Sequence, residues 1–350
     1  MGIHDLLPFL RKRASSAFTP IGFNLQRFRG QRTAIDVAIQ LHRIIFILQT
    51  DSVAALSEWF LRTHSQFLKA EITPTYVFDG AKLDAKNGEA VKRAKARSKA
   101  LERAEKLRAD FASACKESES SMQLSAAAHA LQIAETRTLK PSPSLFLAIE
   151  HALCSVGANC VTAQSEAEKH CAALSQHDKV DFVITNDSDT LPFGAKRVLF
   201  FFGSAKAELC ELEPVLTELK LSLDEFRHFC VLSGCDFCDR VPGIGIVKAY
   251  ELVVKHRTIP ALVAFDARFG VPVSFPIDSD ALDAAIADVR DELDDLDTEQ
   301  KTRREALVIQ LERLAQERRA LDVRTEQARG VHAFLTRYQI ALDIFLIADA

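Results

Sequence analysis

Four β-like runs in this sequence end in, or just before, acidic residues, and this feature restricts the possible folds more than any other. The runs span residues 32–36, 75–79, 157–161 and 181–185, and their acids are Asp36, Asp79, the pair Glu166 and Glu168, and the pair Asp187 and Asp189. Helical patterns separate the runs, at residues 53–68 and 145–156 among others. Strands that alternate with helices predict an α/β fold with a mainly parallel, doubly wound sheet flanked by helices. Because ligands bind beyond the carboxyl ends of such strands, we expect the acids to converge on one crevice.

Carboxylates gathered in this way need cations. Together with Asp236, seven acids in one crevice would repel one another severely. Oxygen ligands without His or Cys select Mg²⁺ or Mn²⁺ over zinc. Two such ions about 4 Å apart can clamp a phosphodiester for in-line cleavage. A single acid at a strand end is more often a helix cap or a salt-bridge partner, but four such clusters in one sheet favour a metal site.

A second interpretation starts from the tetrapeptide Asp187-Ser188-Asp189-Thr190. A D-x-D-x-T motif after an apolar strand is also how an aspartyl-phosphate phosphatase presents its nucleophile. This hypothesis leaves the acids of the other three runs without a role, and Asn186 separates the motif from the strand. It is therefore the weaker alternative.

The formal net charge of −4 hides two opposed blocks of charge. Residues 82–108 hold ten Lys and Arg against four Asp and Glu, whereas residues 278–299 hold ten acids and one base, Arg290. A basic stripe can bind phosphates, although such a run is more often a solvated helix face. Residues 81–143, which include this stripe, interrupt the alternation of strands and helices. We expect helices there that arch over the crevice.

The remaining composition describes an ordinary globular chain, with 48% hydrophobic and 26% charged residues. No apolar run approaches the roughly 20 residues that cross a bilayer, and the first residues lack a signal-peptide core, so we expect an intracellular protein without membrane contact. Eight cysteines fit a reduced compartment. Cys235 and Cys238 form a lone C-x-x-C pattern, for which small apolar packing in a helix is favoured over structural zinc.

The C-terminal third reads as helical. Residues 223–232 and 246–256 are predicted helices on either side of a turn at residues 234–245. Residues 280–329 have the pattern of two long helices. Their leucines at 307, 311, 314 and 321 keep near-heptad spacing, which predicts an antiparallel helical hairpin.

Eight short motifs occur in collinear order between residues 1 and 245. They are Met1-Gly2-Ile3, Ala34-Ile35-Asp36, Val77-Phe78-Asp79-Gly80, Ser165-Glu166-Ala167-Glu168, Thr185-Asn186-Asp187-Ser188-Asp189, Phe193-Gly194, Leu232-Ser233-Gly234-Cys235-Asp236-Phe237-Cys238 and Pro242-Gly243-Ile244-Gly245. In this order they resemble the XPG/flap-endonuclease family of structure-specific 5′ nucleases, which includes related 5′→3′ exonucleases. The resemblance implies an active enzyme with two Mg²⁺ ions, for which Mn²⁺ can substitute. It assigns the metal ligands as Asp36, Asp79, Glu166, Glu168, Asp187, Asp189 and Asp236.

The resemblance also implies roles for basic and aromatic side chains. Lys86 and Arg93 match a catalytic pair on the first arch helix, and seven residues are two helical turns, so both would face the scissile phosphate. Either one alone could equally be a solvated surface cation. His42 matches the position of an aromatic residue that stacks on a base near the cut, although it could also be an ordinary surface histidine of a helix.

The segment Gly243-Ile244-Gly245 matches the family's helix–two-turn–helix DNA-binding element. Glycines let backbone N–H groups approach a phosphate, and the next helix N-terminus favours the anion. In the family a monovalent cation, typically K⁺, also binds in this loop. The resemblance implies DNA contacts from Gly2, His42, Gly243, Gly245 and Lys248.

By this resemblance the chain divides into five regions. They are an N-terminal nuclease region (1–80), a helical arch (81–143), an internal nuclease region (144–220), the helix–two-turn–helix element (221–265) and a C-terminal helical region (266–350) with a hairpin insertion at 280–329. No sliding-clamp-binding peptide is evident, and no protein partner is indicated. The chain departs from the family at His4-Asp5, where a polar residue and glycine are usual, and at Asn186, where an acid is usual.

The predicted function is hydrolysis of branched DNA at single-strand/duplex junctions in replication or repair, in the nucleus if the organism is a eukaryote. Both a 5′-flap endonuclease and a 5′→3′ exonuclease fit, because the Ser165–Glu168 motif resembles the former and His42 the latter. The alternative within the same fold is a junction-binding scaffold with weak catalysis.

Overall fold

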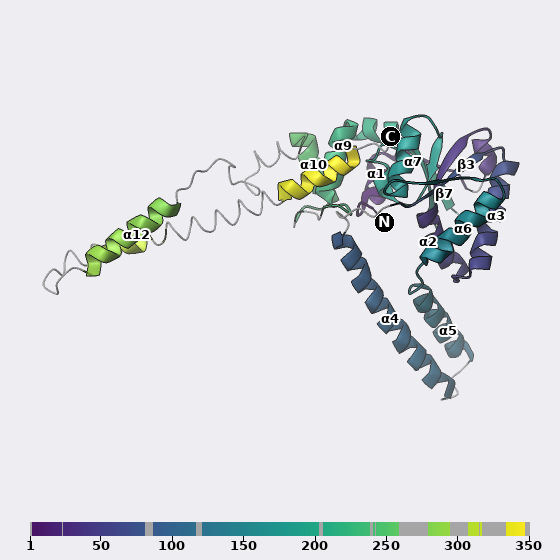
Figure 1. Cartoon of the computed structure of the whole chain (residues 1–350), viewed down its shortest axis with the longest axis horizontal. Coiled ribbons are helices and arrows are strands. Elements are labelled where there is room, and N and C mark those ends of the chain that lie inside the picture. Colours follow the sequence, from purple (N-terminus) through teal and green to yellow (C-terminus); the bar gives the residue numbers. More distant parts are fainter. Residues whose placement is uncertain are drawn as a thin grey trace. The chain divides into compact units, whose positions relative to one another are not determined.

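The computed structural model describes residues 2–22, 24–80, 87–116, 121–202, 206–238, 241, 243–258, 279–294, 307–314, 316 and 334–346. The chain divides into two compact units, Met1–Lys255 with Ile340–Ala350, and His256–Gln339 (Figure 1). In the second unit, α12 (Ser279–Asp294) and residues 307–314 are helical. The rest of the expected hairpin at 280–329 lies outside the described residues, apart from residue 316.

The first unit is built on a sheet of seven strands in the order β1-β7-β6-β5-β2-β3-β4. The strands are β1 (Phe18–Pro20), β2 (Arg32–Asp36), β3 (Thr73–Phe78), β4 (Asn159–Thr162), β5 (Phe182–Ile184), β6 (Arg197–Phe202) and β7 (Lys206–Glu211). Neighbours from β6 to β4 are parallel, whereas β7 runs antiparallel to both β6 and β1. The four predicted strands are all present and all parallel. The antiparallel edge was not predicted, because its strands carry no motif.

Helices cover both faces of this sheet, which confirms the doubly wound α/β fold. Figure 1 shows α2 (Val37–Leu48), α3 (Val53–Lys69) and α6 (Pro143–Ser155) beside β3. Their apolar side chains form one buried cluster with Ile35 of β2 and Tyr76 of β3. Because side chains alternate along a strand, Asp36 points to the opposite face from Ile35. On that face α7 (Ala167–Gln176) packs against β2, β3 and β5.

Further helices extend the first unit beyond the sheet. They are α1 (Leu6–Arg13), α8 (Leu212–Leu219), α9 (Leu223–Ser233) and α10 (Ile246–His256), with short 3₁₀ turns at Ser15–Ala17, Leu25–Phe28 and Ser188–Thr190. The helices predicted at 223–232 and 246–256 are confirmed. The ring of Phe9 lies 5.4 Å from the rings of both Phe229 and Tyr250, so α1, α9 and α10 share one aromatic contact.

The predicted helical excursion from the sheet is also present. It consists of α4 (Asn87–Lys116) and α5 (Ser121–Thr136), which run side by side in opposite directions (Figure 1). An ion pair of 2.6 Å between Arg108 and Glu135 joins the two helices. We refer to this pair of helices as the arch.

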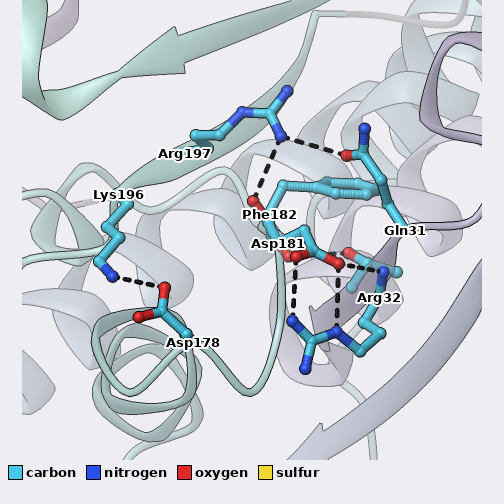
Figure 2. A network of polar contacts seen from close by, with 8 residues as sticks. Gln31, Arg32, Asp178, Asp181, Phe182, Lys196 and Arg197 are labelled. Carbon is cyan, nitrogen blue, oxygen red and sulfur yellow. Dashed lines mark hydrogen bonds and ion pairs between the residues drawn. The ribbon is translucent and has the colours of Figure 1, made fainter.

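Polar contacts fix the register at the amino ends of β2 and β5 (Figure 2). The guanidinium of Arg32 donates to both carboxylate oxygens of Asp181, at 3.2 and 3.0 Å, and the Arg32 amide donates to the same side chain at 2.7 Å. These hydrogen bonds lower the pKa of Asp181. Arg197 of β6 donates to the Gln31 side chain at 3.1 Å. The acids discussed below lie at the other, carboxyl ends of these strands.

None of the described helices is by itself long and apolar enough to span a membrane. The pair α2 and α3 meets that test only in combination, and it is bent by 116° at the break between the helices.

Asn186, the position where the family usually carries an acid, holds the end of β6. Its Nδ2 donates to the carbonyl of Phe201 at 2.7 Å, and its Oδ1 accepts from the Phe201 amide at 2.9 Å. An aspartate could make only the second of these bonds and would place an oxygen against the carbonyl. The side-chain amide of Asn186 therefore has a structural role in this chain.

We expect Asn186→Asp to lower the free energy of unfolding by about 1–3 kcal/mol, because it removes one bond and adds a repulsion. Urea unfolding followed by circular dichroism measures the change. Asn159→Asp is the matched control, since the amide of the exposed Asn159 donates at 2.9 Å to the Thr75 hydroxyl, which can itself become a donor. The control should stay within about 0.5 kcal/mol. Equal losses in both variants would contradict a special role for Asn186.

Candidate active site

Asp36 is the most buried of the β2 and β3 acids and lies where β2 passes into α2. Its Oδ1 accepts from the Ile39 amide at 3.1 Å, which caps the helix. Its Oδ2 accepts from the hydroxyl of Thr185 at 3.1 Å, at the end of β5. The side chain is thus fixed between two neighbouring parallel strands at their carboxyl ends.

Asp79 lies directly after β3 and interacts with the next element of the site. Its Oδ1 accepts from the Ala167 amide at 2.9 Å, so a residue from another strand caps α7. The N-cap position of α7 belongs to Glu166 and not to the preceding Ser165, although serine is a common N-cap residue. The carbonyl of Ser165 instead accepts from the Gly80 amide at 2.7 Å, which joins the two segments.

Glu166 and Glu168 therefore both lie at the start of α7. Glu168 is in the first turn and is buried, while Glu166 at the N-cap is partly exposed. Acids in a first turn interact favourably with the helix dipole. The close approach of Gly80 to the carbonyl of Ala163 leaves no space for a Cβ, which explains the glycine after Asp79.

Asp187 and Asp189 lie close together in the turn that follows β5. Along an extended strand, residues two apart would point the same way, but β5 ends at Ile184 and residues 188–190 form a 3₁₀ turn. Asp187 caps this turn, and its Oδ1 accepts from the Asp189 amide at 3.1 Å. Both side chains are buried. The turn, and not strand alternation, brings the two carboxylates to one place.

Gly2 packs directly against this turn. Its φ is +80°, and a Cβ there would collide with Asp187 Oδ1, with Ser188 Oγ and with Asp189 Oδ1. The N-terminal segment thus approaches the carboxylate pair closely, despite the His4-Asp5 departure from the family pattern. Gly2 was predicted as a DNA contact, and the structure places it at the acids.

The acids influence one another electrostatically. Burial raises the pKa of Asp36 well above its usual range, and the charges of Glu168, Asp79 and, to a smaller extent, Asp187 raise it further. The hydrogen bond from the Ile39 amide acts in the opposite direction. Four predicted ligands from four segments are therefore near neighbours. An excess of negative charge of this kind is what bound cations relieve.

Asp189 is near two cysteines that precede Asp236 in the chain. Burial raises the pKa of Cys230 and of Cys235, and the charge of Asp189 raises both further. Cys235 is the residue before Asp236, which is partly exposed in the turn after α9. Cys235 and Cys238 exchange backbone hydrogen bonds of 3.0 and 3.3 Å in this turn, so the C-x-x-C pattern does not lie in a helix, contrary to expectation.

Cys171 is a neighbour of the site that sequence reasoning missed. It lies on α7 one turn after Glu168, is fully buried, and has a raised pKa because of burial and the charges of Asp36, Glu168 and Asp79. Thr185 was missed as the hydrogen-bond donor to Asp36. The helical spacing from Glu168 could have indicated the first, but only the register of β2 and β5 reveals the second.

The donor set fits hard divalent cations, because the predicted ligands at this end of the sheet are all carboxylates. Within the described residues, no group of three or more His, Cys, Asp or Glu side chains is arranged so that it could hold a metal ion as it stands.

The predicted arch and stacking residues are only partly among the described residues. Lys86 lies outside the described residues. Arg93 lies on α4, and its side chain is also outside the description. His42 is exposed on α2, one and a half turns beyond Asp36. Their assigned roles remain predictions.

The Gly243 loop leads directly into α10. Gly243 has φ +78°, a conformation that favours glycine, and the carbonyl of Gly245 accepts from the Ala249 amide at 2.9 Å in the first turn of α10. Among the described residues other than the chain neighbours, nothing lies within 4 Å of a Cβ built on either glycine. Lys248 is exposed on the same helix turn.

We expect Gly245→Ala to weaken DNA binding without changing the rate of the saturated enzyme, because the added methyl keeps a phosphate away from the backbone. Loss of one phosphate contact should flatten the slope of log affinity against log salt by about 0.9. Fluorescence anisotropy over a salt series measures the slope. Gly245 needs no positive φ, so alanine leaves the fold intact, as thermal unfolding would verify. An unchanged slope would contradict a backbone contact at this position.

Comparison with known proteins agrees with these observations. Residues 1–100 match the XPG N-terminal domain and residues 157–236 match the XPG I-region. The chain is 30% identical over 294 residues to flap endonuclease 1-A of Oryza sativa subsp. japonica, covering 79% of this chain and 73% of that protein. It is also 30% identical over 266 residues to exonuclease 1 of Drosophila melanogaster. That match covers 73% of this chain and 34% of that protein.

The fold is similar to that of a solved structure described as the catalytic core of Rad2 in complex with DNA substrate. The TM-score is 0.53 at 20% identity, covering 88% of this chain and 80% of that one. The sheet, its acidic carboxyl end and the helical arch define an α/β protein of the nuclease class. The chain belongs to the XPG/flap-endonuclease family of structure-specific 5′ nucleases.

Proposed function

We propose that this protein is a Mg²⁺-dependent 5′ nuclease that hydrolyses branched DNA close to the junction between single strand and duplex. The observation that carries the proposal is the buried carboxyl of Asp36, whose pKa is raised by burial and by the charges of Glu168, Asp79 and Asp187 at one end of the sheet. A catalytic group of carboxylates with this excess charge is a ready site for divalent cations. Membership of the family supplies the reaction class.

In this proposal the seven acids named above hold two Mg²⁺ ions, or Mn²⁺ in their place. Bound there, the ions supply a hydroxide nucleophile and stabilise the charge of the in-line transition state. The chain's own part is to orient the ligands. Thr185 and the Ile39 amide hold Asp36, the Ala167 amide holds Asp79, and the Asp189 amide holds Asp187.

The proposal gives the two DNA-facing elements different tasks. Lys86 and Arg93 of the arch stabilise charge at the scissile phosphate, and His42 stacks on a base near the cut. The Gly243–Gly245 turn, with Gly2 and Lys248, holds the DNA, and a K⁺ ion can bind in the turn. Because the relatives include both a flap endonuclease and an exonuclease, both modes of cleavage belong to the proposal.

A 5′-labelled flap substrate incubated with the protein and Mg²⁺ tests the proposal. We expect cleavage near the junction that stops with EDTA and returns with Mg²⁺ or Mn²⁺. Nicked, gapped and blunt duplexes in parallel decide between endonuclease and exonuclease. Binding without cleavage of any of these DNAs would contradict the proposal and favour a junction-binding scaffold. Hydrolysis of p-nitrophenyl phosphate with no effect on DNA would favour the phosphatase alternative.

A further inference from the structure

A tight turn between α6 and β4 brings two cysteines together. The amides of Val156 and Ala158 donate to the Leu153 carbonyl at 3.2 and 3.1 Å, and the Gly157 amide donates to the Cys154 carbonyl at 3.0 Å. Gly157 has φ +80°, which allows this compact helix end. The chain therefore reverses over a few residues. Cys154 in the last turn of α6 and Cys160 in β4 become neighbours.

The two thiols are near each other. Cys154 is exposed, whereas Cys160 is partly buried against the core cluster, opposite Tyr76 in the register of β3 and β4. The Cys154 side chain is close enough to raise the pKa of Cys160. A helix end and the strand after a tight turn can bring two cysteines within reach of a disulfide.

The two thiols differ in their access to solvent. Burial raises the pKa of Cys160 to about 12, and the neighbouring Cys154 and Glu150 side chains raise it further. Cys160 therefore keeps its proton, and Cys154 is the thiol that a reagent in solution can reach. An exposed thiol beside a partly buried one can serve as an attacking and resolving pair.

We propose that Cys154 and Cys160 are a modification site at which small-molecule disulfides, such as oxidised glutathione, close an intramolecular disulfide. Cys154 sulfur attacks one glutathione sulfur, the glutathione S–S bond breaks, and one glutathione thiolate leaves. Cys160 sulfur then attacks Cys154 sulfur, the mixed disulfide breaks, and the second glutathione leaves with the Cys160 proton. The two cysteines are oxidised, and one glutathione disulfide is reduced to two thiols.

The disulfide would act on an edge strand of the described sheet. β4 is the last strand in the order and pairs with β3 alone. The same strand leads within a few residues to the segment 165–168 at the carboxylate end. Tethering β4 to α6 at Cys154 should therefore slow local opening of this edge.

Peptide mapping of the full native chain tests the proposal directly. Trypsin cuts after Arg137 and Lys169 but not between Lys140 and Pro141, so residues 138–169 form one peptide that contains Cys154, Cys160 and no other cysteine. After oxidised glutathione and alkylation with N-ethylmaleimide, we expect this peptide to lack the mass of two hydrogen atoms and to carry no alkyl group. The closed ring should exceed the glutathione adduct of the same peptide by at least about tenfold, because the second thiol competes at a high effective concentration.

Two further measurements make the result decisive. Cys115 is exposed and is the one cysteine of α4, so it should carry glutathione under the same conditions and report that the oxidant acted. In Cys160→Ser, Cys154 should stop at the glutathione adduct. Amides of residues 159–168 should exchange hydrogen more slowly in the oxidised wild-type chain. A peptide 138–169 that is fully alkylated, or that retains glutathione in the wild type while Cys115 is modified, would overturn the proposal.

Discussion

Asp187→Asn should lower the single-turnover rate of flap cleavage in Mg²⁺ by at least about a thousandfold, because it removes one charge from a carboxylate group on which transition-state stabilisation depends. Asparagine keeps the volume of the side chain and an Oδ1 that can still accept from the Asp189 amide. The 3₁₀ turn should therefore survive. The rate loss would report chemistry, and unfolding experiments should show little change.

A control and a second readout separate this loss from a general defect. Asp178→Asn makes the same chemical change in the turn before β5, where Asp178 forms an exposed ion pair with Lys196 (Figure 2). Asp178 has φ +56°, which asparagine tolerates, so its rate should be native. DNA affinity in Ca²⁺ should change little in either variant, because phosphate contacts elsewhere dominate it. Near-native turnover of Asp187→Asn would show that the metal site has been assigned to the wrong acids.

The central sheet could be predicted because its signals are local. Each of the four parallel strands is a short apolar run bounded by turn residues, and each is followed by acids. The same residues therefore indicate the strand, its direction and the end of the sheet at which the site lies. β6 and β7 carry no such marker, and their antiparallel pairing depends on partners far along the chain. The alternation of strands and helices could not reveal that Asn186, after β5, donates to Phe201 of the neighbouring strand β6.

The site shows the same division between local and long-range information. The acids themselves were identified by type and spacing, but the way in which they are held was not. Asp79 caps α7 from 88 residues away, and Thr185 binds Asp36 from 149 residues away. The backbone at Asp187 turns where simple strand geometry predicted extension. Sequence reasoning thus indicates which groups a site needs, whereas the hydrogen bonds that orient them come from tertiary structure.

Arg93→Ala should reduce the single-turnover rate about 10²–10³-fold, equivalent to about 2.7–4 kcal/mol, while changing DNA affinity by a much smaller factor. In the proposed mechanism Arg93 offsets charge that develops only in the transition state, so its loss acts on the chemical step. Lys95→Ala is the matched control. Lys95 is an exposed cation on the same helix, and residues two apart do not share a helix face.

The comparison with Gly245→Ala makes the arch experiment decisive. If Arg93 acts at the scissile phosphate and Gly245 on the bound duplex, the first variant loses rate at saturating protein and keeps its salt slope, and the second does the reverse. Equal rate losses in Arg93→Ala and Lys95→Ala would mean that the arch contributes only a diffuse positive field. If Arg93→Ala instead lost affinity alone while Gly245→Ala lost rate, the arch would be the DNA-holding element and the Gly243 loop would lie at the cut.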